Sequence, residues 1–484
     1  MSKSLRPARL CGLPDTAVWM RLRCAAMLVL GLLLAGCKGI QTAGEKEGRR
    51  NARSVGASYR PHGQKPQLPS LSADSSLSNF LAFAMLNQAK VEAAYYDWAA
   101  SIERITQARS LPDPQLTFQM DIANIVSSVM PGLMMNFPGP GKLRAGAEVA
   151  SAESRSKYFT FQSAVLESAF AVKRAYYQLY FLTEKVRVNR ETLRLLTDLE
   201  ELARSQNEVG KVTLQDVLRA QMEQERLKND IANLEDSRNS LVAQFKAALG
   251  LGAADSAPPV PERFESTPLD LTAERLFETA LAQNTRLKAM EAEVRAAEAG
   301  IALARKARMP DSSLGVMADV KASPIFYRPL ATISLPLWRD KIAAQIAEAQ
   351  ANKRSAQARL STEQIALAVD FAERTYLYRE ATRNLELLRG QLVPKARQSL
   401  EVARSGYLAG QIDFFNLTDS ERTLLGFDLE RVEAAAQREI TLAELSLIIA
   451  GMPPSGTGMG AGRAGMGRSS PPGRKATPAG NSMR

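Results

Sequence analysis

Residues 147–209 read AEVASAESRSKYFTFQSAVLESAFAVKRAYYQLYFLTEKVRVNRETLRLLTDLEELARSQNEV and contain neither glycine nor proline. At about 1.5 Å per residue, a single α-helix over this stretch is about 95 Å long, far longer than the helices of ordinary globular domains. Apolar and small residues recur at a seven-residue spacing in two rows: Val165, Val172, Leu179, Val186 and Leu193, and Ala175, Leu182, Leu196 and Ala203. This heptad pattern predicts close left-handed packing against neighbouring helices.

Outward from this helix, the sequence repeats itself. Pro112 recurs 198 residues later as Pro310, each followed by an aspartate, and Gly210 recurs 200 residues later as Gly410. A period this long indicates a domain duplication rather than a solenoid of short repeats.

Each half has the same predicted order: a helical segment, a strand–turn–strand stretch bounded by prolines, a very long helix, a glycine turn and a last helix. The expected helices span about 76–110, 143–209 and 213–250 in the first half and about 272–309, 340–409 and 412–450 in the second; the strands lie in about 114–138 and 312–336. Two short helices stacked end to end have about the length of one long helix, so together the helices can form the wall of a cylinder of even height. Gly390 and Pro394 predict a kink in the second long helix.

The proline-bounded stretches carry alternating apolar residues, as in Leu116, Phe118 and Met120, which is typical of strands. Four strands per chain cannot close a barrel, and open sheet edges are not tolerated in lipid, so membrane insertion requires several copies. Four methionines raise the alternative of a copper site in the first hairpin, although apolar packing is the simpler interpretation: Met120, Met130, Met134 and Met135.

Composition excludes most enzyme classes. The chain has one histidine, His62, and three cysteines, Cys11, Cys24 and Cys37. A Ser-His-Asp triad, a histidine metal site and a zinc–cysteine cluster all lack their side chains, so we expect no enzyme, no metal and no cofactor. The net charge of +11 does not indicate nucleic-acid binding, because the basic excess lies in the first 75 residues and in 453–484, while the body 76–452 is nearly neutral.

The N-terminal region predicts export. An apolar run, CAAMLVLGLLLAG (24–36), follows Arg21 and Arg23 and has the length of a signal-peptide core. It ends in Leu-Ala-Gly before Cys37, which resembles the bacterial lipobox; the resemblance implies that Cys37 is acylated, with palmitate among the chains, and becomes the mature N-terminus. Lys38 in place of aspartate implies sorting to the outer membrane. An ordinary secretory peptide with a chance cysteine is the alternative, and the start codon is left open between Met1 and Met20.

The predicted organisation is a lipoprotein signal peptide (1–36), acylated Cys37 with a flexible tether (37–75), a first repeat (76–252), a linker (253–271), a second repeat (272–452) and a disordered basic tail (453–484). His62 lies in the tether and is expected in solvent.

The repeat with its helix–hairpin–long helix–turn–helix order resembles the TolC family of outer-membrane efflux proteins. The glycine-turn phrases NEVGKVTLQDVLRAQ and GYLAGQIDFFNLTDS, and the Ala280-Leu281, Asn284, Leu287 pattern, carry the resemblance. It implies a homotrimer with a helical tunnel across the periplasm and a 12-stranded barrel in outer-membrane lipid, coupled to a periplasmic adaptor and an inner-membrane pump. The phrase FPGPGKLR (137–144) is similar to one in the heavy-metal efflux branch.

Two questions stay open at this stage. The hairpins span only the residues from Pro112 to Pro138 and from Pro310 to Pro336, fewer than is usual in the family, so a scaffold anchored by lipid and without a pore is the alternative to a channel. The cargo, whether drug, metal ion or polypeptide, is not encoded in these patterns.

The candidate site is the periplasmic mouth at the two glycine turns. Thr213 with Asp216 predicts a capping box, and Asp413 can cap the equivalent helix. By resemblance, Tyr407 with Asp216 links neighbouring helices and keeps the entrance closed, although Ile412 stands where relatives often have an arginine. Asp419 has two interpretations: a member of a carboxylate ring that faces the tunnel axis, as the resemblance implies, or a residue on a solvated helix face.

Overall fold

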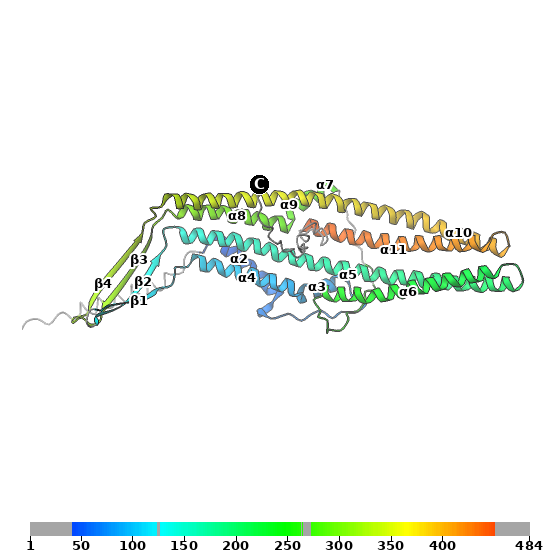
Figure 1. Ribbon diagram of the computed structural model, residues 1–484, viewed down its shortest axis with the longest axis horizontal. Coiled ribbons are helices and arrows are strands. Elements are labelled where there is room, and N and C mark those ends of the chain that lie inside the picture. Colours follow the sequence, from blue (N-terminus) through cyan, green and yellow to red (C-terminus); the bar gives the residue numbers. More distant parts are fainter. Residues whose placement is uncertain (1–40, 123–125, 263, 265–272, 451–484) are drawn as a thin grey trace, which may run out of the picture.

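The computed structural model describes residues 41–122, 126–262, 264 and 273–450, and the predicted signal peptide, Cys37 and the C-terminal tail lie outside them. The chain is strongly elongated, with its helices along the long axis, a small sheet at one end and two glycine turns at the other (Figure 1). Among the described helices, none combines the length and apolarity needed to cross a membrane.

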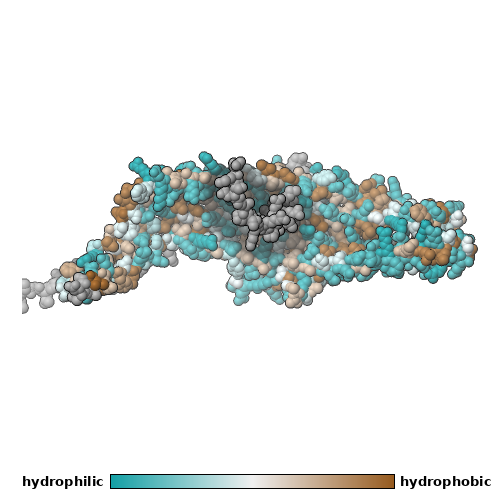
Figure 2. Space-filling model, in the orientation of Figure 1, coloured by the Kyte–Doolittle hydropathy of each residue, from teal (hydrophilic) through white to brown (hydrophobic). Residues whose placement is uncertain are grey.

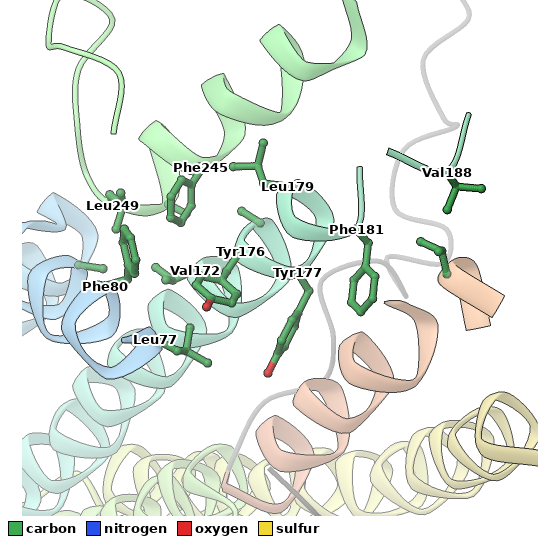
Figure 3. Close-up of a cluster of buried hydrophobic side chains, with 14 residues drawn as sticks. Leu77, Phe80, Val172, Tyr176, Tyr177, Leu179, Phe181, Val188, Phe245 and Leu249 are labelled. Carbon is green, nitrogen blue, oxygen red and sulfur yellow. The ribbon is translucent and has the colours of Figure 1, made fainter. Parts of the chain in front are cut away.

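The first repeat consists of α3 (Leu77–Asn87), α4 (Ala89–Arg109), β1 (Gln115–Ile122), β2 (Val126–Phe137), α5 (Lys142–Glu208) and α6 (Leu214–Ala248). The single long helix that the heptad predicts is confirmed by α5, which has 67 residues. At its middle, Tyr176 packs against Phe80 of α3, with ring centroids 5.9 Å apart, and Phe80 packs against Phe245 of α6 at 5.4 Å (Figure 3). This buried aromatic cluster fastens the two shorter helices to the long one.

The second repeat consists of α7 (Ala273–Gln283), α8 (Thr285–Lys306), β3 (Asp311–Asp319), β4 (Phe326–Ser334), α9 (Arg339–Leu387), η2 (Leu388–Leu392), α10 (Val393–Leu408) and α11 (Phe414–Ala450). A kink in the second long helix was predicted from Gly390 and Pro394, and the structure has a single π turn, η2, at that place. Pro394 has no N–H for the carbonyl of Gly390, so the regular α ladder is interrupted there.

The first helical segment of each repeat was predicted as one helix, and this is wrong. The segments break at Gln88 and at Asn284, which both have extended ψ angles. The Asn87 amide donates to the carbonyls of Leu249 and Gly250 at 2.9 Å. The Asn284 amide donates to the carbonyl of Ile448 at 2.9 Å. Each amide thus joins the break to the end of the last helix of its own repeat, which a local pattern does not reveal.

One antiparallel sheet joins the two repeats in the order β1-β2-β3-β4. The strands of the two hairpins therefore number four per chain, as predicted. Strand β2 pairs with β3 across the repeats, with Gly132 opposite Met317. Hydrophobic side chains lie over the sheet and its junction with the helices (Figure 2). The most exposed are Leu116, Phe118, Ile122, Tyr327, Ile333, Leu335, Leu337 and Trp338.

The sheet register weakens the copper alternative. Met120 lies opposite Val129, and Met130 lies opposite Gln119, so these two methionines point to opposite faces. Met120 is exposed, whereas Met130 is buried. Met134 and Met135 are adjacent in one strand and likewise alternate, so the four sulfur atoms do not gather on one face.

The flexible tether predicted for 37–75 is wrong for residues Ala43–Tyr59, which form a helix, α2. Thr42 caps it by accepting from the Glu45 N–H at 3.1 Å. Ala52, Val55 and Tyr59 of α2 pack on the aromatic cluster around Trp98 and Phe161. The sequence hides the rest of what holds α2, because it depends on charge: Glu45 is fully buried against Arg109 of α4, with 2.8 Å between Oε2 and Nε. Tertiary ion pairs of this kind leave no apolar period. His62, in η1 (Pro61–Gly63), is exposed as expected.

Candidate functional site

The two glycine turns lie next to each other at the end of the chain far from the sheet (Figure 1). Gly210 and Gly410 both have φ of 71°, a left-handed conformation that glycine adopts without strain. The bonds around them match: the Lys211 N–H donates to the Gln206 carbonyl at 2.9 Å, and the Gln411 N–H donates to the Gly406 carbonyl at 2.8 Å. The duplication therefore presents two equivalent helix hairpins at this end.

The first turns of α6 and α11 are capped as predicted. The Asp216 carboxylate accepts from the Thr213 N–H at 3.2 Å and from the Thr213 hydroxyl at 2.9 Å. The Asp413 carboxylate accepts from the Asn416 N–H at 2.9 Å. These bonds explain why a carboxylate stands at each start, and they engage Asp216 within its own hairpin.

Tyr407 lies between the two hairpins rather than on their surface. Its ring is buried and packs against Phe414 with centroids 5.7 Å apart, in a cluster that also contains Ala203 and Val217. Burial, with the nearby charge of Asp216, raises the pKa of Tyr407 to about 12. Its hydroxyl has no hydrogen-bond partner among the described residues. The structure thus brings Tyr407 and Asp216 into one neighbourhood without a bond between them inside the chain.

Asp419 is exposed on α11, two turns beyond the glycine turn. Three residues further on, Arg422 forms an ion pair with Glu223 of α6, which joins the last helices of the two hairpins. The site therefore has one ion pair between α11 and α6, Arg422 with Glu223, and one exposed carboxylate, Asp419, beside it.

A residue that the sequence interpretation missed is Glu421, which is buried on α11. A signal was present, since Leu417, Glu421 and Leu424 are spaced by four and three residues and so occupy one face of the helix. Burial, with a further contribution from the charge of Glu223, raises the pKa of Glu421 to about 7, although Arg422 acts in the opposite direction. A carboxyl in such a seam is a candidate functional group.

No group of three or more histidine, cysteine, aspartate or glutamate side chains that could hold a metal ion occurs in the part of the chain that the structure describes. The site consists of two capped helix hairpins that contact each other through a small apolar cluster and one ion pair. Such an arrangement can widen or narrow by sliding of packed helices.

A duplicated chain of long helices with a four-stranded sheet at one end defines a class of outer-membrane channel proteins. The sequence profile of the family described as outer membrane efflux protein matches residues 84–251 and 276–451, one match for each repeat. The chain belongs to this family, and the function predicted from the sequence, the outer-membrane channel component of an efflux system, is confirmed.

The chain is 23% identical over 342 residues to the cobalt-zinc-cadmium resistance protein CzcC of Cupriavidus metallidurans, which covers 66% of this chain and 77% of that protein. Among solved structures, it is similar to the outer membrane protein VceC of Vibrio cholerae, with a TM-score of 0.65, 17% identity, and coverage of 79% of this chain and 99% of that one. For CusC, the TM-score is 0.68 at 16% identity, covering 80% of this chain and 95% of that one. These structures share the fold.

Proposed function

We propose that three copies of this chain assemble into a passive conduit from the periplasm to the exterior, which receives cargo from an inner-membrane pump through a periplasmic adaptor. The observation that carries this is the sheet: β1 and β4 each have one edge without a partner strand in the described chain. Lipid does not tolerate such edges, and three copies supply the twelve strands of a closed barrel. Nine residues of β3, tilted about 40°, rise about 23 Å, close to the height of an outer-membrane apolar band.

The test is native mass measurement in mild detergent followed by conductance in planar bilayers. A trimer that forms discrete channels supports the conduit. A stable monomer without conductance would instead favour the lipid-anchored scaffold without a pore.

The lipid anchor on Cys37 is part of this proposal, and the position of α2 supports it. The hydroxyls of Thr42 and Ser151 are 3.0 Å apart, and Ser151 lies nine residues into α5, about 14 Å from the junction of sheet and helices. Five extended residues span about 17 Å, so a lipid on Cys37 can reach the membrane surface at the sheet. Cys37→Ser should abolish labelling by a fatty-acid analogue; equal labelling of the variant would refute the anchor.

Gating at the mouth is the second part. A hydrogen bond from Tyr407 to Asp216 of the neighbouring hairpin, formed by a small shift of the two hairpins, would satisfy a hydroxyl that is buried without a partner in the described chain. Tyr407→Phe combined with Asp216→Ala should raise single-channel conductance. If Asp419 belongs to a carboxylate ring, Asp419→Asn should weaken cation preference without changing pore size; unaltered selectivity would place Asp419 on the solvated outer face.

For the cargo, the similarity to a cobalt-zinc-cadmium resistance protein favours divalent metal cations. Deleting the gene should then sensitise cells to cobalt, zinc or cadmium salts. Sensitivity restricted to organic drugs would refute this choice of cargo and leave the conduit itself intact.

A further inference from the structure

A cavity of about 320 Å³ lies between α5, α10 and α11, on the mouth side of the molecule. Leucine side chains line it from three helices, Leu195 and Leu199 from α5, Leu400 from α10 and Leu424 from α11, and charged residues surround them. Glu421 also lines it, with only 3% of the residue exposed to solvent. The Oε1 atom of this carboxyl has no hydrogen-bond partner among the residues that the structure describes.

Two other buried carboxylates in the part of the chain that the structure describes are paired. Glu45 accepts from the Arg109 guanidinium at 2.8 Å, and Glu200 accepts from the Gln221 amide at 3.0 Å. Glu421 has a cation next to it in the sequence, but Arg422 is engaged with Glu223 on α6. A buried carboxylate without a counter-charge is costly, and Glu421, unlike Glu45 and Glu200, has no hydrogen-bond partner for its Oε1 atom among the described residues.

The remaining charged groups around the cavity do not supply that partner. They are Glu191 and Asp198 on α5, Arg397, Glu401 and Arg404 on α10, and Asp428 on α11. Glu191 pairs with Arg187 and Asp428 pairs with Arg431, while both arginines of α10 are exposed and form no ion pair in the described structure. The two acids of the rim that form no ion pair with a described residue, Asp198 and Glu401, balance the two arginines, so the net negative charge of the cavity comes from Glu421 and favours an entering cation.

We propose that this cavity binds a small organic monocation, an ammonium or guanidinium group on a compact apolar body, with its charged end on Glu421. The size is at the lower end of that of ligand pockets, and a set of leucine side chains around one buried charge is what such a ligand requires. A charge-assisted hydrogen bond to Glu421 replaces the missing counter-charge, and the apolar body covers the leucine walls. A metal ion is a poorer occupant, since the described part of the chain has no three-ligand cluster.

Occupancy would link the helices that form one side of the mouth, because the cavity is bounded by both helices of the second hairpin and by α5 of the first. Binding requires ionised Glu421. Since burial and the charge of Glu223 raise the pKa of Glu421 to about 7, the fraction of binding-competent protein falls below that pH. The apparent dissociation constant should rise in proportion, by about tenfold or more between pH 8 and pH 5.5.

The experiment uses the full-length protein in detergent and isothermal titration calorimetry with phenethylammonium chloride, beside its uncharged analogue phenethyl alcohol. At pH 8 we expect saturable binding of the cation at one site per chain, and binding of the alcohol at least about tenfold weaker. Glu421→Gln should weaken cation binding by about tenfold or more, whereas Glu430→Gln, an exposed glutamate on the same helix, should leave it unchanged.

Leu195→Phe provides a second variant, because it narrows the cavity without touching the carboxyl, and it should also weaken binding. Equal binding of cation and alcohol would show a purely apolar cavity and overturn the proposal. Binding that survives Glu421→Gln, or no binding of the cation at pH 8, would overturn it as well. None of these outcomes bears on the trimeric conduit, which is measured independently.

Discussion

Buried polar groups have hydrogen-bond partners at one end of the helical body and lack some of them at the other. Near the sheet, Glu45 of α2 is completely buried, and its carboxylate accepts from Arg109, Arg49 and Thr106 at 2.8–3.1 Å. Near the mouth, Tyr407 and Glu421 are also buried, but each has an oxygen without a hydrogen-bond partner in the described chain. A fully paired hydrogen-bond network stabilises one packing of the helices. A buried polar atom without a partner can gain one from a ligand, from another chain or from a different packing of the helices.

The same difference shifts the pKa of the buried carboxyl in opposite directions at the two ends. Burial would raise the pKa of Glu45, but hydrogen bonds from Arg109, Arg49 and Thr106 hold it below its usual range. At Glu421, burial is opposed only by Arg422, and the pKa rises to about 7. One end is therefore stabilised by an ionised carboxylate, and the other by a protonated one.

The largest effect is expected from Glu45→Ala, which removes the carboxylate that the buried Arg109 side chain binds. Breaking a buried ion pair of this kind costs about 3–5 kcal/mol, and we expect α2 to detach and become sensitive to limited proteolysis. The matched control is Glu47→Ala on the same helix, whose exposed pair with Arg155 has an N–O distance of 3.9 Å and should contribute about 0.5 kcal/mol or less. Equal protease sensitivity of the two variants would contradict the comparison.

The pH dependence should differ in sign between the ends. A carboxyl with a raised pKa in the folded state binds its proton more tightly there than in the unfolded chain. Its stabilising contribution is therefore lost as pH rises from about 4.5 towards 7. Glu45 behaves oppositely, since its contribution is present above its ordinary pKa and lost as pH falls below it.

Hydrogen exchange, corrected for the intrinsic pH effect, should accordingly show residues 414–430 opening more readily at pH 8 and residues 43–59 opening more readily at pH 4. Glu421→Gln should remove the dependence at the mouth and stabilise the folded chain at pH 8 by about 1–3 kcal/mol. A mouth segment that is better protected at pH 8 than at pH 5 would contradict this sign.

A smaller effect is expected at the glycine turns. Gly410→Ala places a Cβ at φ of 71° and should cost about 1–2 kcal/mol in thermal unfolding, although no atom lies within 4 Å of that Cβ. Gly426→Ala on α11 is the control: it has equal room and no positive φ, so it should stabilise the helix by about 0.5–1 kcal/mol. If both variants shift the melting temperature in the same direction, backbone strain is not what these turns require.

The smallest effect should come from Tyr407→Phe measured on stability alone. The hydroxyl makes no hydrogen bond within the described chain, so its loss should change the free energy of unfolding of a monomeric preparation by about 0.5 kcal/mol or less. Tyr407→Ala removes the ring packed on Phe414 and should cost about 3–5 kcal/mol. A phenylalanine variant that loses more than about 1 kcal/mol would mean that the hydroxyl is bonded inside one chain.

The local pattern of the sequence was sufficient for the long helix, the hairpin strands and the mouth turns. Absence of glycine and proline over 147–209, a seven-residue spacing and two-residue alternation are periodic properties of the backbone itself. The capping residues Thr213 and Asp413 were equally accessible, because a cap acts on the residues next to it. The family followed from the order of these elements.

Sequence by itself thus determined the duplicated helix–hairpin–helix plan, the four strands and the place of the mouth, all of which rest on contacts between residues near in sequence. Tertiary structure alone decided the helix α2, the breaks at Gln88 and Asn284, the pairing of β2 with β3, and the isolation of Glu421. Each of these depends on a partner more than fifty residues away or, for Glu421, on the absence of a partner within reach. Charge pairs and amide caps over such distances follow no period, so they are settled only when the helices pack.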